Sequence, residues 1–121
     1  MRTTKADFRA FKESFQRYAT LFGLAGYRVE FAHTPLAWND GGYVDACIHR
    51  DEDGKFAEVC YTTDFPDDAV AENNPKAAAK HEAIHLMLSR IVHLAQDRWS
   101  RQEEIKKEEE QLVRVLEKVI P

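Results

Sequence analysis

The segment KHEAIHLML, residues 80–88, places two histidines four positions apart, with a glutamate directly after the first. On a helix this spacing brings the imidazoles of His81 and His85 to one face, about 6 Å apart, within reach of one tetrahedral Zn²⁺ ion. Glu82 points about 100° further round the helix. It would stand beside the metal and, as a general base, could take a proton from a water molecule on the zinc.

A catalytic zinc site usually has three protein ligands, so the histidine pair needs a partner. The last predicted helix contains KKEEEQLVRVLEKVI, and Glu109 lies about 40° from the mean direction of its apolar side chains. Glu109 is therefore the expected third ligand. Glu108 and His93 are the alternatives, although His93 requires a break in the motif helix. The glutamate run can also be an ordinary solvated surface.

Two other interpretations of the histidine pair stay open. The zinc could stabilise a binding or regulatory module that catalyses nothing. Alternatively, the histidines could be core residues of a metal-free interaction protein, with other hydrogen-bond partners. The sequence favours a zinc-dependent hydrolase, because two histidines and a carboxylate on adjacent turns make an awkward core without a metal.

The elements that must position the motif can be predicted from periodicity. An aromatic stripe with alternating steps of three and four predicts an N-terminal amphipathic helix that ends at Gly23 and Gly26. Residues 27–33 alternate as a strand does. Asn74 and Pro75 are a helix-start signal for a motif helix that runs to Gln96, and a last helix follows from Ile105. The stripe consists of Phe8, Phe11, Phe15, Tyr18 and Phe22.

The segments GYVDACIHR and KFAEVCYTT flank DEDG, whose Asp53 and Gly54 predict a two-residue hairpin turn with positive φ angles. This register places Cys47 opposite Cys60, and free thiols are expected although a bridge stays open. The predicted fold class is α+β, with an N-terminal helix, a three-stranded mostly antiparallel sheet with a hairpin, the HExxH helix and a C-terminal helix. One face of the hairpin carries Val44, Ala46, Ile48, Val59 and Tyr61, and the other Asp45, Cys47, His49, Glu58 and Thr62.

A chain of 121 residues fits one domain, expected to span 1–121. The net charge of −4 gives no general reason to expect a nucleic acid or an anionic membrane as partner. No stretch is as long and apolar as a membrane span, and the start of the chain has no secretory signal. We therefore expect a cytoplasmic protein that acts on a peptide or protein, with its oligomeric state open.

HEAIH, preceded by a helix and a three-stranded hairpin sheet and followed by a helix with EEEQLVRVLE, resembles the minimal zincin metallopeptidases of the gluzincin type. It is most similar to small predicted metallopeptidases of bacteriophages and prophages, which are distantly SprT-like or ImmA/IrrE-like. The resemblance covers nearly the whole chain in element order, but only these two short motifs are residue-specific.

The resemblance implies Zn²⁺ held by His81, His85 and Glu109, with Glu82 as general base. It also implies a peptide bound along a sheet edge, and the host cytoplasm as location if a phage encodes the protein. The chain lacks the third-ligand histidine of SprT-like proteins and the residues that follow the third ligand in the ImmA/IrrE type. The biological roles of those groups are therefore not transferred.

Peptide hydrolysis also needs a donor for the negative charge that develops on the carbonyl oxygen. Four side chains are chemically able to donate, and each also has a structural role as its alternative. The polar loop DFPDDAVAENNP, residues 64–75, has the length of a lid or substrate-facing rim. The candidate donors are His33, Tyr43, His49 and Tyr61.

Overall fold

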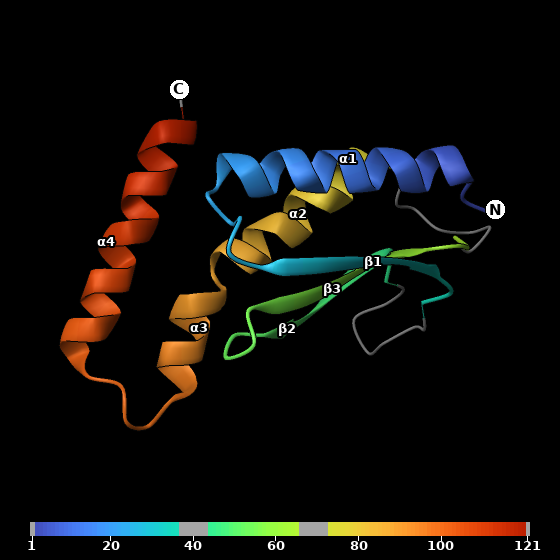
Figure 1. Cartoon of the computed structure of the whole chain (residues 1–121). Coiled ribbons are helices and arrows are strands. Elements are labelled where there is room, and N and C mark those ends of the chain that lie inside the picture. Colours follow the sequence, from blue (N-terminus) through green and yellow to red (C-terminus); the bar gives the residue numbers. More distant parts are fainter. Residues whose placement is uncertain (1, 37–43, 66–72, 121) are drawn as a thin grey trace.

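The computed structural model describes residues 2–36, 44–65 and 73–120. Helices α1 and α2 pack against each other on one face of a three-stranded sheet, and α3 and α4 follow beyond one end of it (Figure 1). The predicted α+β class is confirmed, with the N-terminal helix first and the C-terminal helix last. The elements are α1 (Lys5–Leu21), β1 (Arg28–Thr34), β2 (Ala46–Asp51), β3 (Phe56–Thr62), α2 (Pro75–Met87), α3 (Ser89–Gln96) and α4 (Gln102–Val119).

Helix α1 begins and ends with local signals in the sequence. Thr4 and Asp7 form a capping box, in which each side chain accepts a hydrogen bond from the other residue's backbone N–H, at 3.0 and 2.8 Å. At the other end Gly23 adopts a φ of 73°, and the Leu24 N–H donates to the Ala19 carbonyl over 2.8 Å. This is a Schellman cap, which glycine favours because positive φ strains other residues.

The sheet has the strand order β1-β3-β2, so β2 is an edge strand. Strands β2 and β3 form the predicted hairpin, with Cys47 opposite Cys60, and the predicted register is confirmed. Strand β1 pairs with β3 in parallel, from Arg28 opposite Phe56 to Thr34 opposite Thr62. The sheet is therefore mixed, with one parallel and one antiparallel pair of strands.

The hairpin turn differs from the predicted two-residue type. The last paired residues are Asp51 and Phe56, so four residues connect the strands, and the positive φ falls on Lys55 at 51° rather than on Gly54. Lys55 adopts this conformation while its ammonium group bonds to the buried carboxylate of Glu52. The turn therefore has a different backbone geometry from the two-residue type that the Asp-Gly pair predicts.

The motif helix starts as predicted but ends earlier. The Asn74 side chain accepts a hydrogen bond from the Ala77 N–H at 3.1 Å, and Pro75 is the first helical residue. The predicted continuous helix to Gln96 is wrong, because the chain breaks at Leu88 and continues as α3. The hydroxyl of Ser89, the first residue of α3, donates to the Glu52 carboxylate over 2.9 Å. This tertiary bond holds the start of α3 against the hairpin turn.

The core lies between α1, α2 and the sheet, and the predicted aromatic stripe faces it. Phe11 stacks on Tyr61 with ring centroids 4.8 Å apart, and Phe15 meets Phe31 edge to face at 5.5 Å. Aromatic pairs of this kind add to the stability that burial alone provides. The core cluster consists of Phe11, Phe15, Phe22, Ala46, Ala57, Val59, Tyr61, Phe65, Ala78, Ala79, Ala83, Leu86 and Met87.

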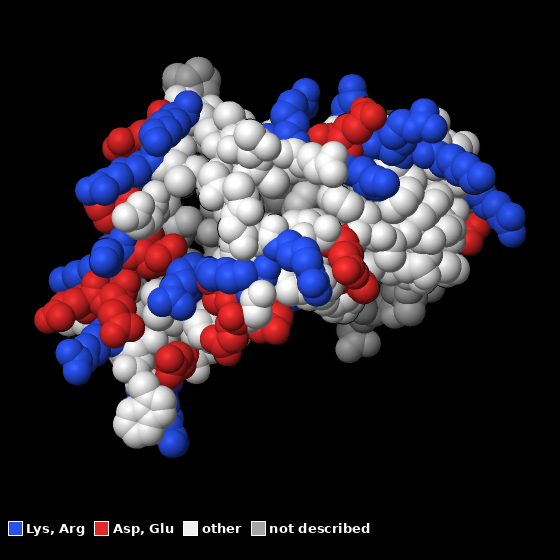
Figure 2. Space-filling model, viewed as in Figure 1, with Lys and Arg blue, Asp and Glu red and all other residues white. Residues whose placement is uncertain are grey.

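Helix α4 packs through only part of its predicted apolar side. One line of side chains contacts the core cluster, and a neighbouring line is exposed. Basic and acidic side chains are interleaved over the outer surface of this helix (Figure 2). Among the described residues no helix is long and apolar enough to cross a membrane. The packed line is Leu112, Val115 and Val119, and the exposed line is Val113, Leu116 and Ile120.

Candidate metal centres

The two histidines of the HExxH motif converge on the exposed side of α2. Their Nε2 atoms are 3.2 Å apart, and their ring centroids are 4.8 Å apart. Two imidazole ligands of a tetrahedral zinc ion, each about 2.0–2.1 Å from the metal, have nitrogens about 3.3 Å apart. The separation between His81 and His85 therefore fits two ligands of one zinc ion.

Strand β2 contacts the motif helix directly. The Arg50 guanidinium donates to the main-chain carbonyl of His85 over 2.7 Å. Burial lowers the pKa of the His85 imidazole, and electrostatic interactions with the neighbouring His81 and Arg50 lower it further. His85 is therefore neutral at physiological pH, which is the form that binds a metal.

Glu82 is buried beside the histidine pair, with 6% of its surface exposed. It lines a pocket of about 300 Å³ with His81 and with Asp45, which precedes β2. Burial raises the pKa of Glu82 above its usual value; His81 and Arg50 oppose this increase, and Asp45 adds to it. No side chain in the described parts of the chain donates a hydrogen bond to its carboxylate. Glu82 is thus placed to exchange a proton with a molecule in the pocket.

The structure does not bring the expected third ligand to the histidines. Helix α4 packs against α3 and faces the side of α2 that carries Ile84 and Met87 across a pocket, and the Ile84 direction is about 100° round the helix from His85. Glu109 is exposed, and Glu108 faces a groove with Lys55 and Arg90 instead. Within the described ranges, neither glutamate belongs to a group of three ligand atoms with His81 and His85.

His93, the remaining alternative, is also directed elsewhere. The break at Leu88 that it required is present, but α3 then runs along the hairpin turn. The Nε2 atom of His93 lies 3.5 Å from the Asp53 carboxylate, and its ring lines a small pocket with Arg50 and Ser89. Besides Glu82, the carboxylate that shares a pocket with His81 is Asp45. The sequence predicted which face of the hairpin carries Asp45, but it did not predict that helix α2 would lie beside this residue.

Three of the four candidate oxyanion donors lie in the part of the chain that the structure describes, and none of these three lines the Glu82 pocket. Tyr61 is fully buried and donates its hydroxyl hydrogen to Asn73. His33 stacks on Phe8 at 4.8 Å, and its ring nitrogen is 2.6 Å from the Thr3 hydroxyl. His49 lies beside Cys47. Tyr43 lies outside the described residues, as does the middle of the expected rim, residues 66–72.

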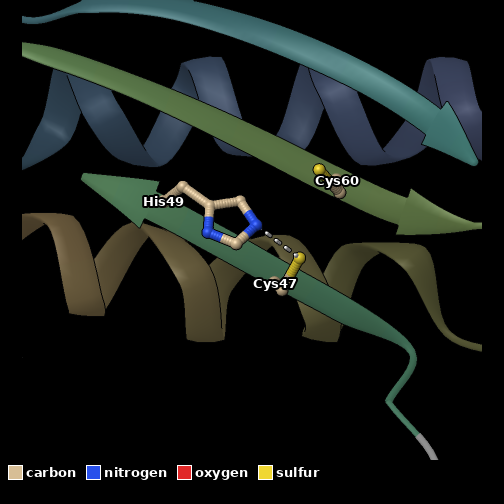
Figure 3. A group of neighbouring side chains, drawn as sticks. All are labelled: Cys47, His49 and Cys60. Carbon is tan, nitrogen blue, oxygen red and sulfur yellow. Dashed lines mark hydrogen bonds between the residues drawn. The ribbon is translucent and has the colours of Figure 1, made fainter. Parts of the chain in front are cut away.

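A second group of metal-binding side chains lies on the sheet. The Sγ atoms of Cys47 and Cys60 and a ring nitrogen of His49 all lie within 4.8 Å of one another. They project from the face of the sheet that is turned away from α1 and α2 (Figure 3). In the described part of the chain this is the only group of three or more such ligands. The predicted register already placed them on one face, but no familiar metal-binding motif has this spacing.

The two thiols are free in this structure. Burial is the main cause that raises the pKa of both, and it acts with the neighbouring Cys47 and Glu58 to raise the pKa of Cys60 to about 12. Without a metal both groups are therefore protonated at neutral pH. This makes them poor nucleophiles, since the thiolate is the reactive form.

Comparison with protein-family models, with curated proteins and with solved structures gives no match. The geometry of the HExxH pair and of the cysteine-histidine group is therefore the basis for a functional proposal.

Proposed function

We propose that the protein is a zinc-dependent hydrolase of peptide bonds, in which His81 and His85 hold the metal and Glu82 is the general base. The observation that carries this proposal is the 3.2 Å separation of the two Nε2 atoms, with Glu82 in the adjacent pocket. Zinc bound to such a pair supplies a Lewis acid that polarises a carbonyl and makes water more acidic.

The side chains of the protein would carry out the proton transfers and hold the cation. Glu82 accepts a proton from the attacking water and later gives it to the leaving amine. Burial supports this role, because it raises the pKa of Glu82 and so makes the carboxylate a stronger base. Neutral His85 offers its lone pair to the cation, and the negative charge of Asp45, in the pocket that His81 and Glu82 line, attracts that cation.

An extended peptide is the substrate that the surrounding fold suits. Strand β2 is the edge of the sheet, and no described strand pairs with its outer side. An exposed edge can add a peptide as a further strand, with main-chain hydrogen bonds along its length. Since Arg50 joins this strand to the carbonyl of His85, a peptide on the edge would run close to the histidine pair.

Metal analysis and peptide cleavage test the proposal together. Replacing both histidines, His81→Asn with His85→Asn, should remove one zinc ion per chain and abolish cleavage of a peptide library. Glu82→Gln should keep that zinc and lose cleavage. His93→Asn is the matched control, because His93 lies against Asp53, and it should change neither quantity. Cleavage by Glu82→Gln at the wild-type rate, or an unchanged zinc content in the double variant, would refute the hydrolase.

A zinc-stabilised binding module is the second candidate. It is favoured by one observation: within the described ranges, no third ligand atom lies close to both histidines. A module of this kind would melt at a lower temperature after chelation, cleave nothing and tolerate Glu82→Gln. A metal-free interaction protein, by contrast, would show the same melting curve with and without a chelator.

A further inference from the structure

We propose that Cys47, His49 and Cys60 form a second Zn²⁺ site, with a structural role, that is independent of the HExxH helix. The three side chains come from the two strands of the hairpin and meet on the sheet face opposite α1 and α2 (Figure 3). Their ligand atoms lie within 4.8 Å of one another. This proposal does not need the hydrolase proposal to be correct.

The strand register explains why the three side chains meet. Cys47 and His49 are two positions apart on β2, so both side chains point to one face. Cys60 is directly opposite Cys47 on β3. Asp45 and Thr62 are opposite each other two residues away from the cysteines, and the Thr62 N–H donates to the Asp45 carbonyl over 2.8 Å. Because hydrogen-bonded and non-hydrogen-bonded pairs alternate along an antiparallel ladder, Cys47 and Cys60 also form a hydrogen-bonded pair.

In a hydrogen-bonded pair the Cα atoms are about 5.5 Å apart and the side chains are further apart than in the alternate type. That leaves room for an ion between the sulfurs. Two thiolates bound to tetrahedral zinc at about 2.3 Å have sulfurs about 3.8 Å apart. The contact between the Cys47 sulfur and the His49 ring nitrogen, at 3.8 Å, is on the same scale.

The donor set selects the kind of metal. Two sulfurs and one imidazole suit Zn²⁺, whereas Mg²⁺ and Ca²⁺ require oxygen ligands. The fourth position can be taken by water or by Glu58, which is opposite His49 and accepts a hydrogen bond from the Cys60 thiol over 3.6 Å. Zinc uptake would displace the two thiol protons to solvent.

The location of the site indicates a structural role. Cys60 is 3% exposed in the central strand, while His49 is exposed on the edge strand. An ion held by these residues would join β2 to β3 through side chains, in addition to the main-chain ladder. Since the unfolded chain does not hold the three ligands together, the ion would stabilise the folded state.

Cobalt substitution tests this site separately from the HExxH pair. The full reduced chain with His81→Asn and His85→Asn should bind one equivalent of Co²⁺ and show a thiolate-to-cobalt charge-transfer band. Adding Cys47→Ser should remove the band, and adding His49→Gln should weaken Co²⁺ binding by about tenfold or more. His93→Gln is the control, and it should leave the band unchanged.

Thiol protection provides a second measurement that needs no cysteine variant. In the same double-histidine variant, Zn²⁺ should slow alkylation of Cys47 at least several-fold, and a chelator should restore the rate. Absence of the cobalt band while both thiols titrate as free would overturn the proposal. So would a Cys47–Cys60 disulfide in protein isolated under reducing conditions. The cobalt band does not depend on hydrolase activity. Each of the two proposals can therefore be refuted without the other.

Discussion

The guanidinium of Arg50 donates a hydrogen bond to the main-chain carbonyl of His85 over 2.7 Å. His85 is in the last turn of α2, where carbonyl groups lack partners further along the helix and the helix dipole favours a positive charge. Arg50 therefore joins the edge strand to the end of the motif helix. It also helps to keep the His85 imidazole neutral, because its charge lowers the pKa of that ring.

Arg50→Ala should lower the free energy of unfolding of the metal-free protein by about 1 kcal/mol, because it leaves the His85 carbonyl without this donor. The control is Arg114→Ala, which removes an exposed ion pair with Glu110 at 3.7 Å and should cost less than about 0.5 kcal/mol. Urea denaturation of both variants measures the difference. Equal effects would show that the link between Arg50 and His85 contributes no more than a surface ion pair.

Glu109→Gln and Glu108→Gln should leave zinc affinity at the histidine pair unchanged, because α4 lies on another side of α2. Asp45→Asn should weaken zinc binding several-fold, since it removes a negative charge from the pocket that His81 lines. Competition with a chelator, in a Cys47→Ser background, measures the affinity of this pair alone. The opposite pattern, with weaker binding only in Glu109→Gln, would restore Glu109 as the third ligand.

Glu52→Gln should destabilise the fold in a pH-dependent way. Burial alone would raise the pKa of Glu52, but hydrogen bonds from Lys55, Tyr27 and Ser89 outweigh it and hold that pKa below its usual value. A carboxylate with a lowered pKa stabilises the folded state above its unfolded pKa, and this stabilisation is lost as the pH falls through the folded value. The variant should therefore lose about 1.5–3 kcal/mol at neutral pH, and less below about pH 4.

Denaturation curves between neutral and acidic pH measure the Glu52 effect. Glu110→Gln is the control, because that carboxylate is exposed on α4, and its small effect should not change with pH. A constant difference between Glu52→Gln and the wild type at every pH would mean that the negative charge of Glu52 does not stabilise the fold.

Gly23→Ala should lower the free energy of unfolding by about 1 kcal/mol, because an alanine at a φ of 73° is strained. Gly26→Ala is matched to it: a Cβ atom at either position meets nothing within 4 Å, and only Gly23 of the two has a positive φ. Gly26→Ala should therefore change stability by no more than a few tenths of a kcal/mol. Thermal unfolding distinguishes them, and an equal loss in both variants would argue against the Schellman cap.

Local signals in the sequence were sufficient for much of the fold. The aromatic stripe predicted α1, a turn centred on Asp53 and Gly54 predicted the register of the hairpin, and Asn74 with Pro75 predicted the start of α2. Each of these depends on residues that are close together in the chain. The convergence of His81 and His85 also follows from spacing alone, because one turn of helix separates them.

The features that could not be predicted depend on contacts between distant segments. The four-residue turn and the break at Leu88 both involve Glu52, whose partners Tyr27 and Ser89 lie far from it in sequence. The average direction of all apolar residues on the last helix points near Glu109, but only the line through Leu112 packs against the core. The cysteine-histidine group can be predicted only from the strand register combined with the face of the sheet to which each side chain points.

The parallel pairing of β1 with β3 influences the order in which the sheet assembles. Only four residues separate β2 from β3, whereas Arg28 must find Phe56 across a much longer loop, whose closure costs more entropy. The hairpin is therefore expected to form first, and β1 is expected to pair with β3 afterwards. Cys47 and Cys60 would face each other from that first step, so the ligands of the proposed zinc site would come together before the sheet is complete.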